Sequence, residues 1–225
     1  MSRKILGMAA LAVALLAQPA FAQDQRVEIG VTFGWAFNDG VDTEDSVLGP
    51  DGNIYNRVDP KDALKWGISG GGYLTEGAEI GFMFSQQNTT LLIDGTQEVE
   101  VGDLSLSNYH GYFAYNFGYA EAKARPYAFF GLGATHFGEV EYTRLIGGGR
   151  GTIGGETQFS TTWGAGVKFF PSPSFGVRAG VQWTPTYIRS DAGGYWCDPY
   201  WGCYLTGDAK YSNQWDLGGG IVFRF

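Results

Sequence analysis

The stretch WDLGGGIVFRF at residues 215–225 decides the fold, because its side chains alternate in character with a period of two. Its odd-numbered positions are apolar apart from one glycine: Trp215, Leu217, Gly219, Ile221, Phe223 and Phe225. Its even-numbered positions are mostly small or charged: Asp216, Gly218, Gly220 and Arg224. A β-strand turns successive side chains to opposite faces. Such a strand therefore suits a wall between hydrocarbon and a polar interior.

Residues 1–22 have the pattern of a secretory signal peptide. Arg3 and Lys4 form a basic start, residues 5–17 form an apolar run, and Ala20-Phe21-Ala22 has the form of a cleavage site. The apolar run is shorter than the roughly 20 residues that a spanning helix needs. We therefore expect cleavage after residue 22 and a single domain over residues 23–225.

The charge and composition exclude several classes of protein. Without residues 1–22 the formal charge changes from −8 to −10, which argues against binding to nucleic acid. No later segment reaches the roughly 18 consecutive apolar residues typical of a membrane helix. Inside lipid, only helices or a closed barrel can pair every backbone N–H and C=O group. The sequence therefore predicts an all-β protein, a closed antiparallel transmembrane barrel with an up-and-down meander.

About eight segments carry the alternating pattern of barrel strands. They are residues 26–38, 64–74, a strand beginning at 80, 109–117, 127–137, 159–170, 175–187 and 215–225. Both faces of residues 127–137 are small and aromatic, so the sequence does not assign that strand an inward face. Residues 99–107 fit either a loop or an extension of the fourth strand.

The connections between these segments alternate in length. Short turns are expected near residues 75–78, 118–126 and 171–174. Long segments are expected near residues 39–62, 88–100, 138–157 and 189–210. Outer-membrane barrels have short periplasmic turns, longer external loops and an even strand number, so both termini are expected in the periplasm.

The chain resembles the small outer-membrane β-barrel superfamily, the OmpA-type barrels often described as porin-like. The resemblance rests on Arg125-Pro126-Tyr127, the glycine-rich Gly131-Leu132-Gly133 and the closing residues 219–225. It implies the Gram-negative outer membrane as the location, and membrane lipids, lipopolysaccharide and the barrel assembly machinery as partners. It also implies that Phe223 and Phe225 serve as the assembly signal. That superfamily includes structural anchors, adhesins, narrow channels and a few lipid-modifying enzymes.

The inward positions of these strands hold charges of both signs. They are Glu28, Lys65, Glu79, His110, Lys168, Arg178, Asp216 and Arg224. The interior of an eight-stranded barrel is just wide enough for side chains to fill. Buried charges must pair, which favours a salt-bridged plug. Many inward glycines would leave space, however, so a narrow pore lined by charge stays an alternative.

The last long segment holds the two cysteines, Cys197 and Cys203, with five aromatic residues around them. In an exported chain an even cysteine count favours a disulfide. The Cys spacing and the lack of a nearby His argue against a metal or redox site. The aromatic residues would either extend the girdle at the membrane surface or form a contact patch for an unidentified surface ligand: Tyr195, Trp196, Tyr200, Trp201 and Tyr204.

The remaining motifs favour no catalytic centre. The first long segment is acidic and is read as a solvated face, with loosely held cations at most. Of the two histidines, His136 has glutamates nearby in sequence, but no serine nucleophile stands at a matching position. We therefore expect no enzyme, no cofactor and no resident metal. The function expected is a structural and surface-interacting one through disulfide-braced loops. The alternatives are a narrow passive channel and, more remotely, an enzyme acting on lipid A.

Overall fold

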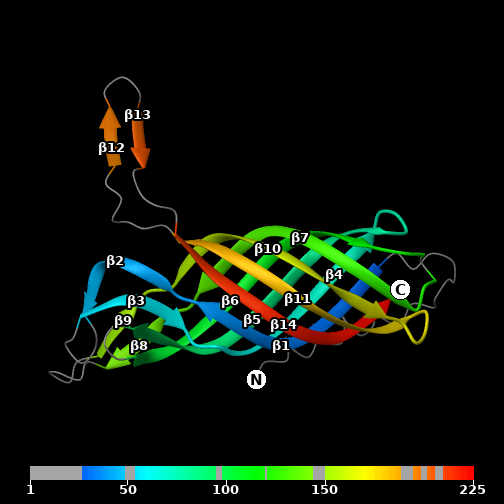
Figure 1. Ribbon diagram of the computed structural model, residues 1–225, viewed down its shortest axis with the longest axis horizontal. Helices are drawn as coiled ribbons and strands as arrows, with labels where there is room; N and C mark the ends of the chain where they lie inside the picture. Colours follow the sequence, from blue (N-terminus) through cyan, green and yellow to red (C-terminus); the bar gives the residue numbers. More distant parts are fainter. Residues whose placement is uncertain are drawn as a thin grey trace, which may run out of the picture.

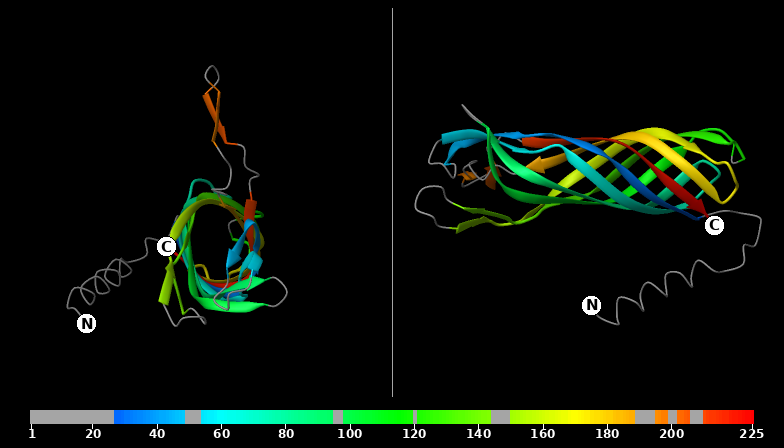
Figure 2. Two further views of the ribbon diagram at one scale, coloured as in Figure 1. Left: turned by 90° about the vertical axis from the view of Figure 1, so that its left-hand side faces the viewer. Right: turned by 90° about the horizontal axis from the view of Figure 1, so that it is seen from below.

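The protein is a closed eight-stranded β-barrel, seen from the side in Figure 1 and end-on in Figure 2. The computed structural model describes residues 27–48, 54–94, 98–119, 121–143, 150–188, 195–198, 202–205 and 210–225. These ranges contain no helix that could cross a membrane. The barrel strands are β1 (Val27–Asp39), β4 (Ala63–Tyr73), β5 (Ala78–Asp94), β6 (Val99–Asn116), β7 (Ala124–Phe137), β10 (Glu156–Phe169), β11 (Phe175–Ile188) and β14 (Lys210–Arg224).

Each barrel strand pairs antiparallel with its neighbours along the chain, and the ring closes between the first strand and the last. This seam runs from the pair Glu28 and Arg224 to the pair Asp39 and Asn213. A closed ring has no free edge, so every strand has a hydrogen-bonded neighbour on both sides. The predicted antiparallel barrel with an up-and-down meander is therefore confirmed.

The outer surface of the barrel is a belt of exposed apolar side chains. Their exposure follows the outward phase that the alternation predicts, with Phe33 65% and Leu217 59% exposed. Further members come from the strands around the ring: Leu64, Ile80, Phe82, Phe113, Leu132, Phe159, Trp163, Val181 and Trp215. An exposed apolar belt of this kind is the surface that meets hydrocarbon in a transmembrane barrel.

Two features that the sequence left open are decided by the structure. On β7 the odd-numbered residues point inward, since Arg125, Gly131 and Thr135 are buried while Leu132 is exposed. Residues 99–107 are strand and belong to β6, which pairs with β5 along its whole length apart from an irregularity at Leu91 and Leu92. The hairpin of β5 and β6 therefore extends beyond the other barrel strands.

The two ends of the barrel differ. The terminal end holds Val27, Phe225 and the short connections 74–77, 117–123 and 170–174. The loop end holds six further strands: β2 (Val41–Leu48), β3 (Ile54–Pro60), β8 (Val140–Thr143), β9 (Arg150–Ile153), β12 (Tyr195–Asp198) and β13 (Gly202–Leu205). β3 pairs with the extended part of β5, while β8–β9 and β12–β13 are separate hairpins (Figure 1).

The extended strands at the loop end have an apolar core of their own, which we call the loop-end cluster. Leu91, Leu104, Leu106 and Val140 are each less than 9% exposed and pack together. Val58, Val101 and Phe137 pack against them from β3, β6 and β7. Burial of this apolar surface ties the β5–β6 extension to the strands around it. The connections at the loop end thus contain regular strands that pack on a core of their own.

Gly220 on β14 should be essential for closing the seam. A Cβ at this position would overlap the backbone carbonyl oxygen of Val31 on β1. A Gly220→Ala substitution forces two hydrogen-bonded strands apart, and we expect it to destabilise the barrel by about 1–3 kcal/mol. The measurement is urea unfolding in lipid vesicles, followed by heat-modifiable gel mobility. Gly70→Ala is the matched control, because a Cβ there meets nothing within 4 Å; equal stability of the two variants would contradict the prediction.

Candidate functional site

The interior of the barrel is the candidate site, because the charged residues predicted to point inward all lie there. Glu28, Glu79, His110 and Lys168 are at most 3% exposed, and Lys65 and Arg224 are below 8%. The side chain of Asp216 is 12% exposed, and Arg178 lines the central cavity. The structure arranges these residues in two layers that cross the interior.

The layer nearer the terminal end is built on ion pairs, and we call it the ionic layer. Lys168 on β10 pairs with Glu28 on β1 and, at 3.0 Å, with Glu79 on β5. Arg224 on β14 pairs with Glu28 at 3.3 Å. These strands lie on different sides of the ring, so the chain of charges spans the interior. Its cations and carboxylates balance two against two.

Hydrogen bonds from neutral side chains complete the ionic layer. Tyr73 Oη donates to Glu28 at 2.8 Å, and Tyr112 Oη donates to Glu79 at 2.5 Å. Asn116 Nδ2 donates to the other oxygen of Glu79 at 3.1 Å. Arg125 on β7 donates instead to the backbone carbonyl of Glu76 at 2.6 Å. Each carboxylate thus has several partners, the condition under which a buried charge is tolerated.

The second layer lies nearer the loop end and is built mainly from amides and hydroxyls; we call it the polar layer. It takes at least one residue from every barrel strand: Asn38, Lys65, Gln87, Asn108, Thr135, Ser160, Thr186 and Gln214. Because all eight strands contribute, the hydrogen bonds run across the full width of the interior.

Gln214 is the centre of the polar layer. Its Oε1 accepts from Lys65 Nζ and from Asn108 Nδ2, both at 2.9 Å. Its Nε2 donates to Gln87 at 2.6 Å and to Asn38 at 3.2 Å. A single amide on β14 therefore joins β1, β4, β5 and β6. All of its hydrogen-bonding capacity is satisfied by side chains across the barrel.

Thr135 on β7 is a second centre of hydrogen bonds in the polar layer, on the side of the interior away from Gln214. It lies in hydrogen-bond contact with Asn108 at 2.7 Å, Ser160 at 3.0 Å and Thr186 at 2.9 Å. His110 Nε2 lies 2.9 Å from Ser160 Oγ, and both residues are 1% exposed. The layer thus closes through β6, β7, β10 and β11.

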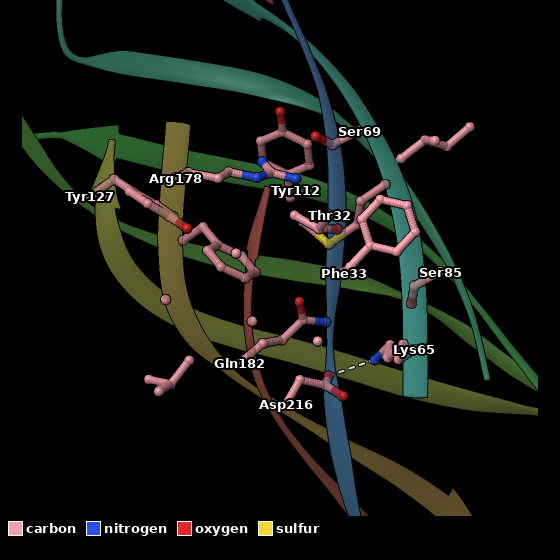
Figure 3. Close-up of a pocket in the computed structure, with 18 of the residues that line it drawn as sticks. Thr32, Phe33, Lys65, Ser69, Ser85, Tyr112, Tyr127, Arg178, Gln182 and Asp216 are labelled. Atoms are coloured by element: carbon pink, nitrogen blue, oxygen red, sulfur yellow. Dashed lines mark hydrogen bonds and ion pairs between the residues drawn. The ribbon is translucent and has the colours of Figure 1, made fainter. Parts of the chain in front are cut away.

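A cavity of about 110 Å³ lies between the two layers (Figure 3). Glu79, Tyr112 and Lys168 line it from the ionic layer, and Lys65 lines it from the polar layer together with its ion-pair partner Asp216 at 2.5 Å. A volume of this size holds several water molecules. This chamber lies within the interior, and residues of both layers line it.

The inward glycines open the interior only in part. Gly180 and Gly218 line the central cavity, whereas aromatic side chains occupy the space beside others. A Cβ at Gly71 would meet Tyr112 Oη at 2.5 Å, and one at Gly166 would meet Tyr127 Oη at 2.9 Å. Gly164 faces the ring of Phe129. The glycines therefore make room for large rings that come from β6 and β7.

The remaining sequence motifs fall at the loop end. Arg57 on β3 forms ion pairs with Asp39 at 2.7 Å, Asp42 at 3.2 Å and Asp59 at 3.9 Å. Partial burial raises the pKa of Asp59, against the lowering effect of the Arg57 guanidinium. Among the residues that the structure describes, no group of three His, Cys, Asp or Glu side chains could hold a metal ion. His136 is on the outer face of β7, where it contacts Thr157.

The disulfide and the loop aromatics concern residues whose side chains lie outside the described part of the structure. The backbone of β12–β13 is described, and its register places Cys197 directly opposite Cys203. Tyr200 and Trp201 lie outside the described residues, as do residues 1–26. Phe223 and Phe225 are on the outer face at the terminal end, 39% and 48% exposed.

The pattern of charged inward residues did not reveal most of the polar layer. Gln87, Asn108, Thr135 and Gln214 stand in the same inward phase as the charges on their strands. Amides and hydroxyls at inward positions near the loop end of each strand were the available signal. On β7 the signal was hidden, because that strand's phase was not assigned.

Lys168 should be the most sensitive position of the ionic layer. Its replacement by methionine leaves Glu28 and Glu79 buried without their shared cation, and breaking such a buried pair costs about 3–5 kcal/mol. We expect Lys168→Met to lower the free energy of unfolding by that amount, measured by urea unfolding in vesicles. Lys61→Met removes an exposed pair with Glu100 and serves as control; it should leave stability nearly unchanged. A stable Lys168→Met barrel would contradict the assignment.

Comparison with known proteins agrees with this architecture. Residues 8–223 match the family described as "Outer membrane protein beta-barrel domain". Neisserial surface protein A, from Neisseria, superposes with a TM-score of 0.55 at 12% identity, covering 88% of this chain and 97% of that chain. OprG of Pseudomonas aeruginosa gives a TM-score of 0.58 at 11% identity, covering 88% and 95%. No curated protein sequence matches the chain.

At such low identity the two solved structures establish the fold alone, whereas the family match extends over nearly the whole chain. The closed antiparallel ring and its exposed apolar belt fit that match independently. The chain therefore belongs to the outer membrane protein β-barrel domain family, and its location is the outer membrane of Gram-negative bacteria.

Proposed function

We propose that this protein is a non-conducting barrel that anchors a structured loop end at the cell surface, where the loops make contacts. In this proposal the loop end is extracellular and the terminal end is periplasmic. The asymmetry between short and long connections supports that orientation, because outer-membrane barrels place their longer loops outside. The proposal assigns no catalytic step to the chain.

The observation that carries the proposal is the polar layer. An open pore needs a continuous water path, and this layer joins side chains from all eight strands across the interior. The ionic layer crosses the interior a second time through Lys168. Opening a path would break several buried hydrogen bonds at once and leave their groups unpaired. The interior therefore supports a plug that fixes the strands rather than a channel.

The packing and the ion pairs of the loop end support a role in binding a partner at the cell surface. The loop-end cluster buries apolar side chains of β5, β6 and β8 above the polar layer. Arg57 ties β3 to the end of β1 through Asp39. Such bracing reduces the entropy that a loop loses when it binds a partner. An open, largely polar hollow at this end offers one place for contact: it is lined by Asn88, Thr89, Thr90, Asp103, Leu104, Ser105 and Glu139.

Contacts with membrane components follow from the same arrangement. The apolar belt would meet lipid chains and lipopolysaccharide, while the acidic groups near Arg57 would lie close to the headgroups. Phe223 and Phe225 would serve the assembly machinery as the terminal strand signal. The aromatic residues of β12–β13 and its connections would form the girdle or the contact patch. The surface ligand is identified no further than a partner of this loop end.

Catalysis has little support in the described residues. Their one contact between a serine and a histidine, Ser160 with His110, is inside the polar layer, where both side chains are 1% exposed. A lipid substrate at the membrane surface would have no access to it. His136 contacts a threonine on the outer face and has no serine partner among the residues that the structure describes.

Planar bilayer recording tests the sealed interior. We expect the refolded wild-type barrel to give no discrete conductance steps in salt, because both layers block the path. Folding and insertion are verified in the same sample by heat-modifiable gel mobility and by protection of the strands from protease. Reproducible steps from a correctly folded sample would support the narrow channel and overturn the plug.

The bracing disulfide gives a second prediction. Directly opposed residues of an antiparallel pair have Cα atoms about 4.5–5.5 Å apart, within the roughly 4.4–6.8 Å that a disulfide needs. Since Cys197 and Cys203 are such a pair, we expect them to be bonded in an oxidising compartment. A maleimide should label intact cells only after reduction. Labelling of two thiols without reductant would contradict the bond, and a Cys197→Ser, Cys203→Ser variant controls for background.

A further inference from the structure

Arg178 on β11 is the one interior cation that the two layers leave without a partner. Among the residues that the structure describes, the interior holds five cations and three carboxylates: Lys65, Arg125, Lys168, Arg178 and Arg224 against Glu28, Glu79 and Asp216. Lys168 and Arg224 are balanced by Glu28 and Glu79, and Lys65 is balanced by Asp216. Arg125 is held by the backbone carbonyl of Glu76.

Arg178 forms no ion pair and no hydrogen bond with any residue that the structure describes, and its Nε is buried without an acceptor. Figure 3 shows its side chain reaching from β11 into the chamber, toward Tyr112 and Ser69. Arg178 is partly exposed, but a guanidinium inside the barrel without a counter-charge is energetically unfavourable. An arginine in this position therefore needs a partner that the protein does not itself supply.

The wall of the chamber is shaped around this guanidinium. A Cβ at Gly30 would come within 3.1 Å of Arg178 Cζ and 3.2 Å of its NH1 nitrogen. The same Cβ would come within 3.0 Å of Ser69 Oγ. The missing side chain of Gly30 thus makes the space in which the guanidinium and the serine hydroxyl lie close together.

Two further donors line the same chamber without a hydrogen bond among the described residues. They are the hydroxyls of Ser69 and Tyr127. Tyr127 Oη lies beside Gly166 and Gly180, since a Cβ at these positions would come within 2.9 Å and 3.0 Å of it. One charged and two neutral donors that have no hydrogen bond among the described residues thus line a cavity of about 110 Å³.

We propose that the chamber binds one small monovalent inorganic anion of the size of chloride, held by Arg178 with help from Ser69 and Tyr127. The anion would be the counter-charge that Arg178 lacks. It would satisfy the guanidinium and the hydroxyls together, and hydrogen bonds between charged groups are about twice as strong as neutral ones. The proposal is independent of the surface role, since a bound ion between two closed layers does not require conduction.

The other charged groups that line the chamber are less suited than Arg178 to bind an anion. Lys65 and Lys168 face the cavity, but each is already bound to carboxylates, Lys65 to Asp216 and Lys168 to Glu28 and Glu79. Asp216 and Glu79 also line the cavity and would repel an anion placed next to them. The anion is therefore expected beside the guanidinium, away from both carboxylates. Water alone would hydrate Arg178 but would not neutralise it.

The direct test is crystallisation of the refolded barrel in bromide, with anomalous scattering used to locate the ion. We expect one anomalous peak next to the Arg178 guanidinium in the wild-type protein and none in Arg178→Gln. Lys61→Gln removes a cation at the loop end, changes the net charge equally and should keep the peak. A wild-type chamber that contains only water in bromide would overturn the proposal.

A measurement in solution covers the case in which Arg178→Gln does not fold. The thermal midpoint of the gel-mobility transition is compared in chloride and in gluconate at equal ionic strength. An ion that binds only the folded state raises the midpoint with its concentration. The variant Ser69→Ala, Tyr127→Phe keeps the charge and should need about tenfold more chloride for the same rise, because two donors are lost. An equal chloride response in this variant and the wild type would overturn the site.

Bilayer recording of the same samples tests separately whether the interior conducts, whatever the halide experiments show. An empty chamber with a silent bilayer would remove the anion and keep the plug. Discrete conductance with a halide peak would keep the anion site and remove the non-conducting role. The two proposals can therefore fail independently.

Discussion

The seam between β1 and β14 is the constraint on which the structure depends. In hydrocarbon no backbone N–H or C=O group can be left without a partner, so the sheet must close on itself. Closure brings the first and the last strand into register, with Glu28 opposite Arg224, and the two side chains form an ion pair. Gly220 lets the two backbones approach closely. Backbone pairing and interior charge are thus satisfied at the same place.

Closing eight strands produces an interior too narrow for bulk water, and this narrowness explains its contents. Inward polar side chains must find their partners across the barrel. The ionic layer does so with charges on β1, β5, β10 and β14, and the polar layer does so with Gln214 and Thr135 as its two centres. Aromatic rings fill the space beside several inward glycines, and a chamber lined by Arg178 lies between the two layers.

The loop end follows a different principle. Beyond the polar layer the inward positions of β6 change from polar to apolar, at Leu104 and Leu106, and these side chains pack with residues of β5 and β8. This part of the molecule is stabilised by an ordinary apolar core and by exposed ion pairs such as that of Arg57 with Asp39. One chain thus combines an apolar exterior with a polar interior in the barrel and reverses that arrangement at its end.

The sequence by itself determined the barrel, because a period of two is a local property of each strand. Alternation gave the outward belt and the inward positions of the charges from Glu28 to Arg224, since neither depends on which strand lies opposite. The tertiary structure decided which residues meet across the interior, because those contacts depend on how far neighbouring strands are staggered. It therefore decided the phase of β7, the partners of Gln214, and the position of Arg178, which forms no ion pair with a carboxylate that the structure describes.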